Sequence, residues 1–221
     1  MDKKFSLFLE NNYKTLKAVI EKLNKKYDYA SVLASDCEGK KIIVSNKSVS
    51  VKDSSWQERG CVIRVFHNGL YSEYSFDDIK SEKEICKKVE ESIDIKEHLY
   101  KSIYVKEYKN VLYQEDTIEK TFSRMGAFEV LPLDQTINEC KKIIDDSMEE
   151  NEYIISARCD VEYLKISKMF LSRKKDLKQS YAWATATYQC VVNRNDITKI
   201  NYGGKSDISM NDALAKLKKA I

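Results

Sequence analysis

The chain has 221 residues, which is enough for one large domain or two small ones. Its 38 Lys and Arg residues nearly balance 35 Asp and Glu residues, so the net charge is +3 and a nucleic-acid-binding surface is not expected. A hydrophobic content of 43% allows a sizeable core. We find neither a signal peptide nor the roughly 20 apolar residues of a membrane span, so we expect a cytoplasmic protein without a membrane partner.

The six cysteines lie far apart, and no two of them form a C-x-x-C pair. This spacing argues against a zinc ribbon and against a thioredoxin-like motif. We expect reduced, mostly buried thiols, although three disulfides are compatible with the count. The cysteines are Cys37, Cys61, Cys86, Cys140, Cys159 and Cys190.

Hydrophobic periodicity predicts that the chain opens with a helix from Phe5 to about Lys26, where apolar residues recur three and four positions apart. Alternating patterns then predict short antiparallel strands at Tyr29–Ser35, Lys41–Ser45, Ser48–Lys52, Gly60–His67 and Leu70–Phe76. The pair Asn68-Gly69 predicts a hairpin, since both residues tolerate positive φ. A second helix is predicted from about Ser81 to Ile93, with Ser81 as N-cap and Glu84 completing a capping box.

The stretch from His98 to Gly126 is the least periodic, and we expect a connector with short strands there. A helix is predicted after Pro132, with Asp134 as its cap and an apolar stripe at Ile137, Cys140, Ile143, Ile144 and Met148. Further strands are predicted at Tyr153–Asp160, Glu162–Phe170, Ser180–Arg194 and Thr198–Tyr202. Gly203 and Gly204 break the pattern, and a final helix is expected from Asn211 to Ile221.

Each half of the chain therefore reads helix, antiparallel strands, helix. We predict an α+β fold of two layered units, each an antiparallel sheet covered by helices. The predicted boundaries are 1–98 for the first unit, 99–126 for a connector and 127–221 for the second unit. The repeated order is compatible with a distant duplication, but it is also a frequent way to build α+β layers.

Candidates for catalysis are few, and we assign neither a catalytic residue nor a metal ligand. The two histidines, His67 and His98, have no partner at helical spacing. The sequence Gly203–Ser206 resembles the end of a phosphate-binding loop but lacks the earlier glycine of that motif. The basic run Arg173–Lys175 with Lys178 is more typical of a solvated turn than of a nucleic-acid site.

The predicted strand from Ser180 to Arg194 has two different faces. Its odd positions carry Tyr, Trp and Thr side chains, and its even positions include three alanines, Ala182, Ala184 and Ala186. Alanines let another layer approach closely, whereas the aromatic face could hold a peptide or partner by stacking and backbone pairing. The alternative is an ordinary core strand with one half-exposed face. Tyr181 and Trp183 are therefore our candidate substrate-binding residues on this strand.

The segment Glu58–Ser75 carries a family likeness. It resembles the G-x-x-x-R-V…(D/N)-G-x-x-(G/S)-x-x-S hairpin of the TldD/PmbA family, which includes metallopeptidases and was labelled "modulator of DNA gyrase". Asp28–Val32 is similar to the family's opening strand, D-Y-A-E-V. The helix after Asp77–Ile79, the later strands and the Gly203-Gly204 pair also resemble family segments, so the likeness covers most of the chain.

The resemblance implies the N-terminal and central region of a TldD/PmbA-type protein. Active members of the family carry an H-E-x-x-x-H zinc motif in a C-terminal domain, and no part of this sequence matches it. We therefore expect no cofactor in this chain, zinc only in a further C-terminal domain, and a chain that is inactive alone. The ending in a helix looks like a truncation before that domain.

Within such a protein, this region would be the non-catalytic part of a metalloprotease or of its metal-free partner subunit. It would shape a homo- or heterodimer cavity that admits extended peptides or unfolded protein. Arg64, in the hairpin, is a candidate buried or cavity-facing charge, with an outward strand arginine as the alternative. A stand-alone peptide- or protein-binding module is the other reading, and a DNA- or gyrase-associated factor is less favoured.

Overall fold

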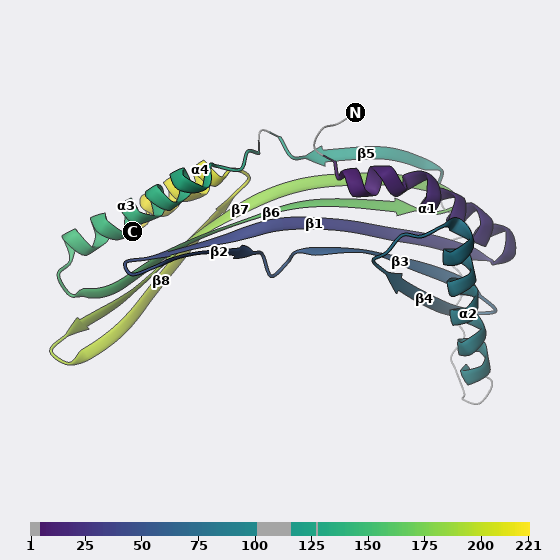
Figure 1. Ribbon diagram of the computed structural model, residues 1–221, viewed down its shortest axis with the longest axis horizontal. Helices are drawn as coiled ribbons and strands as arrows, with labels where there is room; N and C mark the ends of the chain where they lie inside the picture. Colours follow the sequence, from purple (N-terminus) through teal and green to yellow (C-terminus); the bar gives the residue numbers. More distant parts are fainter. Residues whose placement is uncertain (1–4, 101–115, 127) are drawn as a thin grey trace. The chain divides into compact units, whose positions relative to one another are not determined.

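The computed structural model describes residues 5–100, 116–126 and 128–221, with side chains described for all of these except 95–100 (Figure 1). The helices are α1 (Leu7–Lys26), α2 (Glu82–Tyr100), α3 (Leu133–Glu150) and α4 (Met210–Lys218). The strands are β1 (Tyr29–Ser45), β2 (Val49–Asp53), β3 (Glu58–His67), β4 (Leu70–Phe76), β5 (Ile118–Arg124), β6 (Ile154–Leu171), β7 (Lys175–Arg194) and β8 (Ile197–Asp207). These elements confirm the predicted α+β class. None of the described helices is long and apolar enough to cross a membrane.

The strands join into one eight-stranded sheet with the order β4-β3-β1-β6-β7-β5, in which β2 pairs with β1 and β8 with β7. The pairs β1/β2, β3/β4 and β7/β8 are antiparallel. The predicted β3–β4 hairpin is present, and Asn68 and Gly69 at its turn have φ of 49° and 77°. The Asn-Gly pair therefore forms the tight turn for the predicted reason, since both residues tolerate positive φ.

The described residues divide into two compact units whose parts alternate along the chain. Unit 1 draws on Met1–Asp36, Glu58–Ser123 and Ser167–Ser180, and unit 2 on Cys37–Gln57, Arg124–Ile166 and Tyr181–Ile221. The ranges expected from the sequence (1–98, 99–126 and 127–221) are continuous, whereas each unit combines three stretches. The reason is that β1, β6 and β7 each contribute residues to both units. The expected connector lies partly outside the described residues, and its described part contains β5.

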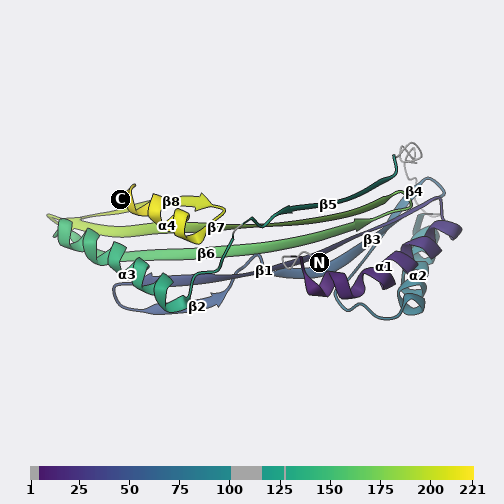
Figure 2. The same ribbon diagram turned by 90° about the horizontal axis from the view of Figure 1, so that it is seen from above.

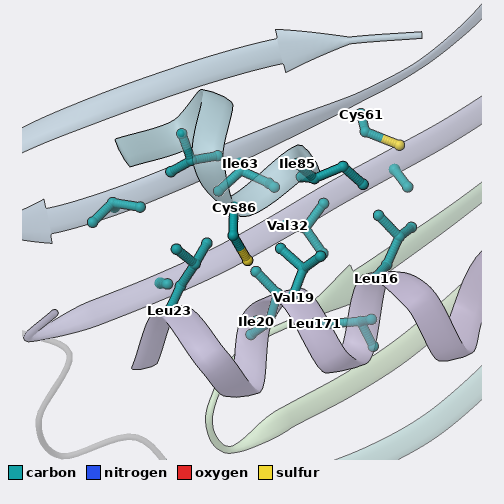
Figure 3. Close-up of a cluster of buried hydrophobic side chains, with 14 of the residues drawn as sticks. Leu16, Val19, Ile20, Leu23, Val32, Cys61, Ile63, Ile85, Cys86 and Leu171 are labelled. Carbon is teal, nitrogen blue, oxygen red and sulfur yellow. The ribbon is translucent and has the colours of Figure 1, made fainter. Parts of the chain in front are cut away.

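The core of unit 1 packs α1 and α2 against one face of its strands (Figure 3). The apolar stripe of α1 is buried as predicted, at Leu9, Leu16, Val19, Ile20 and Leu23. Ile85 and Cys86 of α2, Val32 of β1, Ile63 of β3 and Leu171 of β6 belong to the same buried cluster. Burying a side chain of the size of Leu or Ile contributes about 1.5–3 kcal/mol, so this stripe is a main source of stability in unit 1.

Serine caps fix the starts of α1 and α2. Ser6 accepts a hydrogen bond from the backbone N–H of Leu9 at 3.2 Å and donates to the buried carboxylate of Asp36 at 2.5 Å. Ser81 accepts from the backbone N–H of Glu84 at 3.4 Å and donates to its carboxylate at 2.9 Å. The predicted capping serine is confirmed, and both helices satisfy an N–H group that would otherwise lack a partner.

The basic run Arg173–Lys175 with Lys178 contributes to the structure of unit 1. Arg173 donates to the backbone carbonyl of Asn24 at 2.7 Å, near the end of α1. Carbonyls in the last turn of a helix have no partner within the helix, and a cation there is also favoured by the helix dipole. The Lys178 ammonium lies 4.3 Å from the centre of the Tyr13 ring, within range of a cation–π contact.

The core of unit 2 packs α3 and α4 on one face of its strands, and both helices lie on the same side of those strands in Figure 1. The even positions of β7 from Ala182 to Cys190 are buried, and Ala184, Ala186, Tyr188 and Cys190 belong to this core. The Tyr188 hydroxyl donates to Ser147 Oγ of α3 at 2.6 Å. The predicted cap of α3 is wrong, because Pro132 is the N-cap and Asp134 lies in the first turn.

Three glycines that look like breaks in the sequence lie inside strands. β1 and β6 are each continuous where two shorter strands were predicted, and β8 runs through Gly203 and Gly204 instead of ending before them. At Gly39 a Cβ would lie 2.1 Å from the carbonyl oxygen of Tyr163, so only glycine allows this approach of β1 to β6. Figure 2 shows β1 and β6 as unbroken neighbours.

Candidate functional site

One face of the unit 2 sheet is not covered by α3 and α4, and we call it the open face. Side chains alternate between the two faces of a strand, so every second residue of β6 and β7 belongs to it. The members are Arg158, Asp160, Glu162, Leu164 and Ile166 of β6 and Tyr181, Trp183, Thr185, Thr187 and Gln189 of β7. The odd-even division predicted for β7 is confirmed, since its even positions are buried in the core and most of the odd ones are half-buried.

The aromatic end of the open face holds both of the residues that the sequence suggested on this strand. The rings of Tyr181 and Trp183 are stacked, with centroids 5.8 Å apart and an angle of 13° between the ring planes. Both pack against a small buried cluster of Cys37, Leu164 and Ile166. The two aromatic side chains are half-buried, so they present a preformed apolar surface. Their role in binding stays a prediction.

The charged end of the open face is built around a buried carboxylate. Asp160 is only 7% exposed, and Arg158 donates to its two oxygens in a bidentate pair with distances of 2.5 Å and 2.5 Å. The ammonium of Lys41, on β1, lies 3.5 Å from Asp160. Two cations therefore compensate the one buried anion, as a buried charge requires. The hydrogen bonds to Asp160 raise the pKa of the Arg158 guanidinium.

A groove opens next to this ion pair. Its volume is about 430 Å³, and it is lined by Arg158, Asp160, Thr187, Tyr188, Gln189, Tyr202, Gly203 and Gly204. We call it the Arg158 groove. Tyr202 of β8 is 83% exposed at its edge. A Cβ on Gly204 would lie 3.0 Å from Thr187 Cγ2, so glycine leaves room for the Thr187 side chain at this wall of the groove. Guanidinium, amide and hydroxyl groups thus surround one small volume.

Between the two ends lies Glu162. Its carboxylate accepts a hydrogen bond from the Ser54 hydroxyl at 2.6 Å. The open face therefore changes along β6 from a polar groove at the Arg158–Asp160 pair, through the carboxylate of Glu162, to an apolar and aromatic patch. A ligand that binds along the whole open face would have to present complementary groups in the same order.

Arg64, the third residue suggested by the sequence, lies on β3 in unit 1. Its side chain is 57% exposed and forms an ion pair with Glu73, its neighbour across the hairpin, at 2.5 Å. The guanidinium carbon also lies 5.8 Å from the centre of the Tyr71 ring. The expectation of a buried charge is therefore wrong, and the outward strand arginine describes the side chain. A role in binding substrate stays a prediction.

The thiols are poorly suited to nucleophilic attack, because the thiolate is the reactive form. Burial raises the pKa of Cys61 to about 12. A hydrogen bond with Cys140, and then burial, raises the pKa of Cys159. All six cysteines are buried and free, so the expected burial of the thiols is confirmed.

The residue types that bind zinc do not converge in the described part of the chain. No group of three His, Cys, Asp or Glu side chains there is arranged to hold a metal. The buried Nδ1 of His67 lies 3.6 Å from Asp28 Oδ2, beyond hydrogen-bonding distance, and its ring packs edge-on against Tyr27. His98 lies in α2, and its side chain is outside the described residues. The described surroundings of His67 offer it one carboxylate and an aromatic ring. The family resemblance implies zinc only in a further C-terminal domain, and that stays a prediction.

The sequence reasoning missed Arg158 and Asp160. A usable signal was present, because these opposite charges are two positions apart in a strand whose other face is Ala157, Cys159 and Val161. Two such residues on one side of an otherwise apolar strand are expected to pair with each other.

Comparison with known proteins finds its matches among solved structures; no protein-family model and no curated protein matches the sequence. A "putative modulator of DNA gyrase" from Bacteroides thetaiotaomicron matches with a TM-score of 0.72 and 14% identity, over 96% of this chain and 49% of that chain. One from Thermotoga maritima matches with a TM-score of 0.70 and 13% identity, over 94% and 46%. TldE from Thermococcus kodakarensis matches with a TM-score of 0.58 and 11% identity, over 93% and 46%.

The chain spans about half the length of each matched structure. Identities this low establish a common fold and leave function open. The hairpin signature from which the resemblance was drawn forms the β3–β4 hairpin as expected. The resemblance to the TldD/PmbA family is thereby confirmed at the level of the fold: this chain folds like about half of TldE and of the two gyrase-modulator proteins.

Proposed function

We propose that this chain is the non-catalytic, peptide-admitting part of a TldD/PmbA-type metalloprotease or of its metal-free partner subunit. In this role it shapes a dimer cavity through which extended peptides reach a zinc centre supplied by another domain. The fold likeness to TldE and to the gyrase-modulator proteins supports the family link. The observation that carries the peptide role is the open face of unit 2, with stacked aromatic rings at one end and a polar groove at the other.

An extended peptide is the ligand that such a surface suits. It presents side chains and backbone amides at regular intervals, so one chain can meet the aromatic patch and the polar groove together. Half-buried Tyr and Trp side chains provide large contact areas with little loss of conformational freedom. Peptide recognition of this kind needs no catalytic group in the same chain.

The charged groups of the open face are suited to holding neighbouring side chains in position. Asp160 is engaged by Arg158 and Lys41, and Glu162 accepts a bond from Ser54. Carboxylates held in this way organise their neighbours, and general base catalysis would require one of them to face a reacting group. We place this role in the cytoplasm, where free buried cysteines such as these stay reduced.

The proposal is tested by measuring peptide binding and cleavage with the purified chain. Fluorescein-labelled, unfolded casein peptides are titrated with the chain, and anisotropy is recorded. We expect micromolar binding that is weakened at least fivefold by Trp183→Ala and is unchanged by Leu7→Ala, which removes an exposed apolar side chain of unit 1. The same peptides are incubated with the chain and added zinc, and we expect no cleavage.

Two results would overturn the proposal. Absence of peptide binding up to about 1 mM, or equal binding by the Trp183→Ala variant, would remove the peptide role of the open face. Cleavage by the chain alone would contradict its non-catalytic character. Tight, steeply salt-dependent binding to duplex DNA instead of peptide would favour the gyrase-associated alternative. Sedimentation of the chain alone, and mixed with a family member that carries H-E-x-x-x-H, tests the dimer directly.

A further inference from the structure

The Arg158 groove has the chemistry of an anion subsite. We infer that it binds the carboxylate of an acidic side chain in an extended peptide whose apolar side chain rests on Tyr181 and Trp183. This inference rests on the proposed peptide role and adds to it the class of peptide that is bound.

The first observation behind this inference is that Arg158 is much more exposed than the Asp160 carboxylate it holds. The side chain of Asp160 is 9% exposed, whereas that of Arg158 is 43% exposed. Both residues line the groove, and the guanidinium is the more exposed of the two charged groups. Asp160 accepts from Nε and Nη2 of Arg158, and a guanidinium has five N–H donors, so three donors remain for a ligand.

The charge balance of the cluster favours an anion. Arg158 and Lys41 carry two positive charges against the single negative charge of Asp160. Because Asp160 already fixes the plane of the guanidinium, a second carboxylate meets donors that are preorganised. Bidentate recognition by a held arginine is geometrically selective, so an uncharged amide is a poor substitute for a carboxylate.

The other lining groups complete the subsite. Thr187 and Tyr202 contribute hydroxyls and Gln189 contributes an amide, all from neighbouring strands. A volume of about 430 Å³ lies in the range of small-ligand pockets, roughly 300–1,000 Å³, and leaves room for one acidic side chain with bound water. Gly203 and Gly204 place no side chain in this space.

The distance between the two ends of the open face determines how far apart the apolar and acidic residues of the peptide must be. Along β7, Thr187 and Gln189 are four and six residues from Trp183, or about 13–20 Å at 3.3 Å per residue. An extended peptide covers that span with an apolar and an acidic residue four to six positions apart, both on its inward face. Glu162 lies between the ends and disfavours a second acidic residue in the middle of the peptide.

The test compares matched synthetic peptides that differ in one group. The probes are acetyl-Leu-Thr-Ser-Thr-Glu-amide and the same peptide with Gln in place of Glu, together with both sequences in reverse order. Affinities are measured by isothermal titration with the unmodified chain. For at least one chain direction we expect the Glu peptide to bind about tenfold tighter than the Gln peptide, with the preference falling as salt is raised.

Two arginine variants test whether the preference for the Glu peptide over the Gln peptide depends on the Arg158 groove. Arg158→Gln should abolish it, whereas Arg194→Gln should retain it, since Arg194 lies over the Tyr153 ring and does not line the groove. If Arg158→Gln unfolds because Asp160 loses a partner, two measurements still test the inference. They are the Glu/Gln preference of the Arg158→Lys variant and the same comparison on the unmodified chain. Equal binding of Glu and Gln peptides overturns the inference and leaves the peptide role intact. Failure of every peptide to bind removes the proposed function as well.

Discussion

Replacing Gly39 by alanine is expected to destabilise unit 2. The added Cβ would lie 2.1 Å from the carbonyl oxygen of Tyr163 and 2.9 Å from Leu164 Cδ2. The closer contact is with the backbone of β6, which cannot turn aside as a flexible side chain would, so β1 and β6 must separate. Overpacking of this kind costs about 1–3 kcal/mol, and the reduced freedom of the unfolded chain returns about 0.4–1 kcal/mol. Because the clash is with backbone, the cost lies near the upper end of that range, and we expect a net loss of about 2 kcal/mol.

Urea unfolding followed by tryptophan fluorescence measures this loss, because Trp183 lies in unit 2. For a chain of this length, about 2 kcal/mol corresponds to a fall in melting temperature of roughly 4–8 °C. Gly203→Ala is the matched control, since no atom lies within 4 Å of its added Cβ. We expect that variant to be as stable as the parent or slightly more so. A Gly39→Ala variant within about 0.5 kcal/mol of the parent would refute the close approach of β1 and β6.

Three further perturbations follow from the contacts. Ser6→Ala should lower the stability of unit 1 by about 2 kcal/mol in urea unfolding, since α1 loses its cap and Asp36 loses a donor; no change would show that the cap is dispensable. At pH 8 Ellman's reagent should modify none of the native thiols at the rate of the unfolded chain, because all are buried and the pKa of Cys61 is about 12. Lys216 holds the pKa of Asp207 below its ordinary value, so this pair stabilises α4 above about pH 4 and the effect is lost as the pH falls through the lower pKa. Lys216→Met should therefore reduce the loss of helical circular dichroism between pH 4 and pH 2.

The fold could be predicted from the sequence wherever periodicity and turn chemistry agree. The helix faces, the Asn68-Gly69 hairpin and the cap at Ser81 follow from contacts between residues near each other in the chain. Strand continuity could not be predicted in this way, because Gly39 is required by a strand more than 120 residues later. For the same reason the sequence gives no sign that β1, β6 and β7 each serve two units.

The candidate site was predictable in part. The odd positions of β7 could be assigned to one face because alternation is a local property, and Tyr181 and Trp183 are indeed stacked there. The groove could not be assigned, because its walls come from three strands whose register is set by tertiary pairing. Arg158 and Asp160 look like ordinary strand charges until the burial of the carboxylate is known.

The most direct test of the account is to map where a bound peptide lies. A peptide of the Leu-Thr-Ser-Thr-Glu type with benzoylphenylalanine in place of Leu is cross-linked to the chain by light, and the modified residues are found by mass spectrometry. The account predicts cross-links to the aromatic end of the open face, at Leu164–Ile166 and Tyr181–Trp183, that an excess of unlabelled peptide suppresses. Cross-links confined to unit 1, or spread evenly over the surface, would contradict it.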